Sequence, residues 1–66
     1  MLILLNKQSV EIPPGTSLQS LAVSQGIESQ RVAIAVNMQV IRRDFWAETI
    51  LSEGDSVTII GISKGG

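Results

Sequence analysis

The sequence predicts an α+β fold in which one short helix packs against one face of a small mixed sheet. Two observations lead to this prediction: apolar runs of strand length recur along the chain, and residues 17–25 repeat their apolar side chains at helical spacing. The chain has 66 residues, of which 44% are hydrophobic, so it suits one domain and is too apolar to be disordered. Phe45 and Trp46 are its only aromatic residues, so most of the core has to be aliphatic.

The first two strands are expected at residues 1–5 and 8–12, where they form a hairpin. Residues 1–5 are all apolar, and residues 8–12 alternate polar and apolar at their end. The connection around Asn6-Lys7 is short enough for a hairpin turn. A Pro-Pro-Gly sequence at residues 13–15 ends the second strand, because proline cannot donate to a ladder.

The helix is expected over about residues 17–25. The stretch Thr16–Gln19 has the Ser/Thr-x-x-Gln form of a capping box, and Gly26 stands where a left-handed C-terminal cap is common. A helix this short is marginal alone, so it has to dock on the sheet. The expected docking residues are Leu18, Leu21 and Ile27.

The second half of the chain predicts three further strands. Residues 32–36 have large side chains on one face and alanines on the other, and Val40-Ile41 suits a short return strand. Residues 42–48 suit a turn or a short helical piece with Asp44 as its candidate cap, and either Phe45 or Trp46 points inward. The remaining elements are a turn at residues 52–55 and a last strand at residues 56–62.

This order of elements, an N-terminal hairpin followed by a crossover helix, is what the β-grasp, or ubiquitin-like, arrangement requires. In that arrangement the last strand lies beside the first, and the mixed sheet has four to five strands. We therefore expect a single β-grasp domain at residues 1–62 and a flexible C-terminal Gly-Gly tail at residues 63–66.

Composition and charge exclude several classes of protein. The chain has no Cys and no His, which excludes disulfides, zinc fingers and thiol or imidazole catalysis. Its net charge of −1 lacks the basic surplus of a nucleic-acid binder. The apolar start at residues 1–5 is too short for a signal peptide or for a membrane helix of about 20 residues. We therefore expect a soluble, cytoplasmic protein with no nucleic-acid or membrane partner.

The charged side chains do not predict a catalytic or metal site. Asp44, Glu53 and Asp55 suit surface turns better than a metal site or an acid–base pair. No nucleophile–base pair is recognisable, so we do not expect an enzyme in its own right. Arg42 and Arg43 are candidates for contact with a nucleotide or an acidic partner, although adjacent arginines are usually solvated.

The outer strands have apolar residues on both faces. If Ile3, Leu5 and Val57 face the helix together with Met1 and Ile59, alternation places the next residues on the opposite face. One helix covers only one face of a small sheet, so an exposed patch that binds a partner is expected there, with scattered surface apolars as the alternative. The patch residues are Leu2, Leu4, Ile60 and Ile62.

The C-terminal Gly65-Gly66 is the second candidate site. Glycine has no Cβ, so these residues form the thinnest chain that can enter a narrow tunnel and bring a carboxylate to a reaction centre. The tail Ser63, Lys64, Gly65 and Gly66 spans about 13 Å when extended. Idle, frayed terminal glycines are the alternative interpretation.

With these features the chain resembles the sulfur carrier proteins of thiamin biosynthesis, which are small ubiquitin-like proteins that end in Gly-Gly. The resemblance covers essentially the whole chain. It rests on Asn6, Pro14–Thr16, Ala33–Asn37, Val40, Arg43–Trp46, Leu51, Glu53–Asp55 and Gly65–Gly66. Lys64 is a departure, since the family often has a small or apolar residue there. The small subunit of molybdopterin synthase shares the fold and the Gly-Gly end but is usually longer.

The resemblance implies a function without a catalytic side chain. An adenylating, E1-like enzyme would use ATP and magnesium to activate the Gly66 carboxylate, and a sulfur donor protein would convert it to a thiocarboxylate. Thiazole synthase would then take the sulfur for thiamin. The protein would bind no cofactor itself and act as a co-substrate. The alternatives are a carrier for another pathway such as molybdopterin, or a ubiquitin-like protein-binding or conjugating module.

Overall fold

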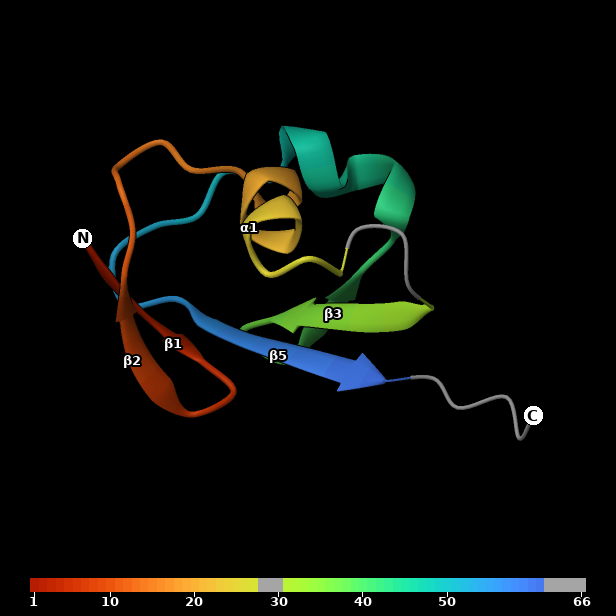
Figure 1. Ribbon diagram of the computed structural model, residues 1–66, viewed down its shortest axis with the longest axis horizontal. Coiled ribbons are helices and arrows are strands. Elements are labelled where there is room, and N and C mark those ends of the chain that lie inside the picture. The colour runs from red at the N-terminus through yellow and green to blue at the C-terminus, as the bar shows by residue number, and fades with distance from the viewer. Residues whose placement is uncertain (28–30, 62–66) are drawn as a thin grey trace.

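The computed structural model describes residues 1–27 and 31–61, and in them five strands form one mixed sheet in the order β2-β1-β5-β3-β4 (Figure 1). The strands are β1 (Leu2–Leu5), β2 (Gln8–Glu11), β3 (Val32–Val36), β4 (Gln39–Ile41) and β5 (Ser56–Gly61). An α-helix, α1 (Leu18–Ser24), and a 3₁₀ helix, η1 (Arg43–Glu48), lie together on one face of this sheet. The pair β1 and β5 is parallel and the other three pairs are antiparallel, which confirms the predicted α+β, β-grasp arrangement.

Two tight turns close the hairpins β1–β2 and β3–β4. Asn6-Lys7 and Asn37-Met38 have nearly the same backbone, with φ values of 51° and 70° in the first turn and 52° and 70° in the second. Two successive positive φ values define the type I′ turn, whose twist matches that of the flanking strands. Asparagine tolerates this conformation better than most residues, which explains its place at the start of both turns.

Both turn asparagines also bind the central strand β5. The Oδ1 atom of Asn6 accepts a hydrogen bond from the Ile59 N–H at 2.9 Å, and that of Asn37 accepts one from the Ser56 N–H at 3.0 Å. The two hairpins are therefore tied to the same strand, at positions three residues apart, by the same kind of contact.

The helix α1 begins one residue later than a capping box at Thr16 requires. Its N-cap is Ser17, whose Oγ accepts a hydrogen bond from the Ser20 N–H at 3.0 Å. The Thr16 hydroxyl donates instead to the Pro13 carbonyl at 2.6 Å, so the predicted Thr16–Gln19 box is wrong. The predicted C-terminal cap is confirmed, because Gly26 has a φ of 73° and the next N–H, of Ile27, returns to Ala22 at 3.0 Å.

The core lies between the helices and the sheet. The predicted docking residues Leu18 and Leu21 are buried, and Ile27 packs against the core while partly exposed. The largest fully buried side chains are Trp46, Ile3, Leu18, Ile34 and Val57. Helices and sheet are therefore joined through aliphatic side chains and a single indole ring.

Of the two aromatic residues, Trp46 is the buried one. It is 1% exposed, whereas Phe45 is 51% exposed. The indole Nε1–H donates to the Ile41 carbonyl at 2.9 Å, and the Arg43 guanidinium lies 4.4 Å from the ring centroid. Asp44 does not cap η1 as expected, because the N-cap Arg42 has no side-chain cap and Asp44 lies in the first turn, 3.4 Å from the Arg42 guanidinium.

Among the described residues, no helix combines the length and the apolar character that a membrane span needs. Residues 28–30 and 62–66 lie outside the description, and so do the last predicted strand residue, Ile62, and the predicted tail.

Candidate functional site

Among residues 1–27 and 31–61, no helix covers the face of the sheet opposite α1 and η1, and we call this face the uncovered face (Figure 1). Successive residues of β1 and β5 alternate between the two faces, so Leu2, Leu4 and Ile60 point away from the core. Their exposed fractions are 49%, 40% and 47%. Three of the predicted patch residues are therefore exposed as expected, while Ile62 lies outside the described residues. That the patch binds a partner stays a prediction.

The register of the sheet divides this patch into two groups. Leu4 lies beside Ser56, whereas Ile60 lies four residues further along β5, about 13 Å away at the usual strand rise, and opposite Ala33. Thr58, which is exposed, stands between them on the same face. The described residues of the predicted patch therefore form two groups, one at β1 and the other beside the end of β5.

Val40 belongs to the uncovered face and was missed by reasoning from the sequence. It pairs with Ala35, which in turn pairs with Thr58, and its exposed fraction is 62%. The alternation in β3 separated the large side chains from the alanines without showing which of them face the helix. The register fixed by the Asn37-Met38 turn was needed to show that Val40 lies on the same face as Ala35.

The strand β5 carries the chain toward the predicted tail. Its last described residue, Gly61, pairs with Val32 at the start of β3. On its other side, β1 ends at Leu5, and the Asn6 side chain occupies the next position by binding the Ile59 N–H. The central strand β5 therefore extends two residues beyond the position at which the Asn6 side chain binds it. The predicted site residues Ser63, Lys64, Gly65 and Gly66 lie outside the described residues.

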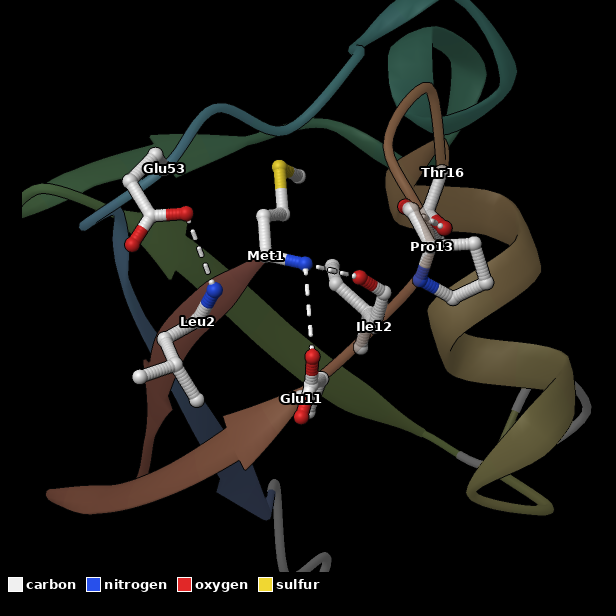
Figure 2. A network of polar contacts seen from close by, with 7 residues as sticks. All are labelled: Met1, Leu2, Glu11, Ile12, Pro13, Thr16 and Glu53. Atoms are coloured by element: carbon white, nitrogen blue, oxygen red, sulfur yellow. Dashed lines mark hydrogen bonds and ion pairs between the residues drawn. The ribbon is translucent and has the colours of Figure 1, made fainter.

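Glu53 and Asp55 shape the turn that precedes β5. Figure 2 shows the Glu53 carboxylate accepting a hydrogen bond from the Leu2 N–H, with an Oε1–N distance of 3.0 Å. The Asp55 carboxylate accepts one from the Ser52 N–H at 2.8 Å and one from the Asn37 amide at 3.0 Å. Both act as turn residues, in line with the interpretation from the sequence. Within residues 1–27 and 31–61, no cluster of acidic side chains could hold a metal ion.

The start of β1 is held by a second set of polar contacts, also shown in Figure 2. The Met1 amine donates to the Ile12 carbonyl at 2.7 Å and lies 4.0 Å from the Glu11 carboxylate. In return, the Ile12 N–H donates to the Met1 carbonyl at 2.8 Å. These contacts extend the β1–β2 pairing by one residue and hold Leu2 at the edge of the uncovered face.

Comparison with known proteins identifies the family. The model of the ThiS family matches residues 3–66, which is nearly the whole chain. The chain belongs to the ThiS family. A relative from Escherichia coli (strain K12), named Sulfur carrier protein ThiS, is 29% identical over 66 residues and is covered completely, as is this chain. The resemblance drawn from the sequence, to the sulfur carrier proteins of thiamin biosynthesis, is thereby confirmed.

Solved structures agree with the fold of this ThiS family member. The crystal structure of the thiamine biosynthesis protein ThiS from Geobacter metallireducens superimposes with a TM-score of 0.85 at 20% identity, and each chain is covered completely. A solution structure of a thiamine biosynthesis protein from the same organism gives a TM-score of 0.79 at 20% identity over 100% of this chain and 88% of the other. At this identity the likeness confirms the β-grasp fold.

Proposed function

We propose that this small carrier protein of the ThiS family carries sulfur on its C-terminal carboxylate, at Gly66, and serves partner enzymes as a co-substrate. The observation that supports this proposal is the family match, which extends through residue 66 and so includes the Gly65-Gly66 pair. The relative named as a sulfur carrier has the same length and aligns over all of it. A cytoplasmic location, where such partners would meet it, is part of this proposal.

The proposed chemistry has two steps. In the first, a Gly66 carboxylate oxygen attacks the α-phosphorus of ATP in an adenylating, E1-like enzyme that also uses magnesium. Pyrophosphate leaves and an acyl-adenylate forms. In the second step, the terminal sulfur of a persulfide on the sulfur donor protein attacks the acyl carbon, and AMP leaves. A thiol then cleaves the acyl disulfide so formed and supplies the two electrons by ending in a disulfide with the donor cysteine, and the released thiocarboxylate has one terminal oxygen exchanged for sulfur. Adenylation is needed because a carboxylate is a poor electrophile, whereas AMP is a good leaving group.

The folded domain supplies recognition in this scheme. The described carboxylates of Glu53 and Asp55 are engaged in turn hydrogen bonds, so the chemistry falls to the partners. The uncovered face offers the exposed apolar residues Leu2, Leu4 and Ile60 for docking, while Ser63 and Lys64 would connect the docked domain to the reacting glycines. The proposed acceptor of the sulfur is thiazole synthase.

Intact-mass measurement tests the proposal. After incubation with the adenylating enzyme of the same organism, ATP, magnesium and a sulfur donor, we expect a mass increase that corresponds to one oxygen replaced by sulfur. A variant that lacks Gly66 should keep its fold and show no increase. An unchanged mass of the full chain, or a mass change that survives the deletion, would contradict the proposal.

The acceptor is tested separately. The thiocarboxylate form is mixed either with thiazole synthase or with the large subunit of molybdopterin synthase, each with its other substrates. We expect return to the carboxylate mass with thiazole synthase alone. If only the molybdopterin enzyme accepted the sulfur, the proposed carrier chemistry would stand and thiazole synthase would be wrong as the acceptor. Adducts to lysines of other proteins would instead identify a conjugating module.

A further inference from the structure

The two ends of the sheet carry opposite charge. We call the end where β5 finishes at Gly61 the tail end, and the end where β5 starts at Ser56 the far end. About 16 Å of strand separates them at the usual rise per residue. The tail end carries the cations Lys7, Arg31, Arg42 and Arg43 and one carboxylate, Asp44, whereas the far end carries Glu11, Glu53 and Asp55 and no described cationic side chain.

Hydrogen bonds and strand pairing place the cations of the tail end. Lys7 follows Asn6, whose side chain binds the Ile59 N–H, and Arg31 precedes Val32, which pairs with Gly61. Ile59 of β5 pairs with Ile34 of β3, and Ile34 pairs with Ile41 of β4. Arg42 follows Ile41 and therefore lies one residue closer to the tail end than these three residues. Cations therefore stand on both sides of the last residues of β5.

The same pairing places the carboxylates at the far end. Glu11 pairs with Leu2, and Glu53 binds the Leu2 N–H. Asp55 comes directly before Ser56, the first residue of β5. Because β1 and β5 run in parallel, the starts of both strands lie at this end, away from the residues that precede the tail.

The positive charge of the tail end is available to a partner. The side chains of Arg42 and Asp44 are 77% and 74% exposed, and an ion pair so exposed contributes little and opens readily. Lys7 and Arg31 are exposed and form no ion pair within the described part of the chain. The two charged residues outside it, Glu28 and Lys64, have opposite signs.

We propose that the tail end recognises a carboxylate-rich protein surface, which borders the opening through which the partner enzyme admits the tail. The proposal rests on the proposed carrier function and names the chemistry of the partner's surface. Opposite charges at the docking end raise the association rate and fix the orientation. The acidic far end would be repelled by the same surface, so the encounter is oriented with the tail foremost.

A protein surface fits the tail end better than the phosphates of a nucleotide. The exposed Ile60 and its partly exposed neighbour Ala33 lie among the cations, and an apolar centre with a charged rim is typical of protein interfaces. In the proposed encounter an extended tail would carry the reacting carboxylate of Gly66 away from these cations, since four extended residues span about 13 Å.

The test compares two double variants with the same net charge. Lys7→Gln with Arg42→Gln removes two positive charges from the tail end, and Met38→Glu with Gln39→Glu adds two negative charges at the exposed β3–β4 turn of the far end. Association with the adenylating enzyme of the same organism is followed by stopped flow at low and high salt. Thermal melts confirm that both variants fold, and Arg31→Gln provides an independent change at the tail end.

We expect the tail-end double variant to associate about five-fold more slowly at low salt, with an unchanged dissociation rate. The difference should vanish near 1 M salt, where the Debye length is about 3 Å. The far-end variant should associate within about two-fold of the natural chain.

The outcomes separate this inference from the carrier function. If the natural chain is adenylated and both double variants associate equally fast, the charged recognition is overturned and the carrier function stands. If the tail-end variant alters the KM for ATP instead of the association rate, the cations face the nucleotide and the inference is again overturned. If the natural chain is not adenylated at all, the carrier function fails, and this inference fails with it.

Discussion

Similar apolar side chains are buried on the face of the sheet that the helices cover and exposed on the uncovered face. Ile3, Ile34 and Val57 point toward the helices and are no more than 2% exposed, whereas Leu2, Leu4 and Ile60 point the other way and stay 40–49% exposed. Burial from water stabilises a fold in proportion to the apolar area removed, so the second group contributes much less to stability. The proposed contact with a partner would account for the apolar character of this second group.

The largest effect is expected on the covered face, at Trp46. Replacing it by Ala should lower the free energy of unfolding by about 3–5 kcal/mol, because a large cavity forms beneath η1. The Ile41 carbonyl would also lose the indole N–H at 2.9 Å. A domain of this size has only a few kcal/mol of stability, so circular dichroism should show a largely unfolded variant at 25 °C.

Phe45→Ala is the matched control for Trp46→Ala. Phe45 directly precedes Trp46 in η1 and is half exposed, so we expect its replacement to lower the free energy of unfolding by less than about 1 kcal/mol in urea titrations. A larger loss at Phe45 than at Trp46 would contradict the assignment of the buried ring.

A second pair of variants compares the two faces directly. Ile34→Ala should destabilise by about 2–4 kcal/mol, and Ile60→Ala by less than about 1 kcal/mol, since both lie in neighbouring central strands and differ mainly in burial. Urea unfolding at equal protein concentration measures both. Equal losses would show that the uncovered face is packed in solution, for example against a second copy.

For partner binding we expect the reverse, with the larger effects from substitutions on the uncovered face. Leu4→Ser and Ile60→Ser should each weaken binding to the adenylating enzyme by about 1–2 kcal/mol while leaving the melting curve nearly unchanged. Because Thr58 separates the two groups, their effects should add in the double variant, as measured by calorimetric titration. If the double variant bound with unchanged affinity, the uncovered face would not be a docking surface for this enzyme.

The smallest effect is expected at a turn, which touches neither face. Asn6→Gly keeps the positive φ but loses the bond to the Ile59 N–H, so a loss of about 1 kcal/mol is expected in urea titrations. Asn6→Ala should be worse by about another 1 kcal/mol, because alanine is strained at a φ of 51°. Asn37→Gly is the comparison: it loses the matching contact to the Ser56 N–H and also the amide contact to Asp55, so its loss should be at least as large, and a much smaller loss would contradict the role given to these turn contacts.

Much of the fold could be predicted because periodicity and turn chemistry are local. The alternation in residues 1–5 and 56–62 gave the two faces, and Gly26 gave the end of α1. The start of α1 was misplaced by one residue, because Thr16 and Ser17 are both good caps and only the Pro13 carbonyl decides between them.

The candidate site was harder to predict, because it depends on register between distant strands. Alternation places Leu4 and Ile60 on one face, but only the pairing of Leu4 with Ser56 shows how far apart they lie. The grouping of Lys7, Arg31 and Arg42 has the same cause. Their positions in the sequence are unrelated, and the parallel pairing of β1 with β5 brings them to one end.

The burial of Trp46 also gives the protein its own optical probe. The chain contains one Trp and no Tyr, so this ring dominates its near-ultraviolet absorbance and its fluorescence. The ring lies on the covered side within the core, and the Arg43 guanidinium of the tail end lies 4.4 Å from its centroid. Its emission should therefore shift strongly to longer wavelength when the chain unfolds, and only slightly when a partner draws Arg43 away from the ring, so that the size of the shift distinguishes loss of structure from formation of a complex.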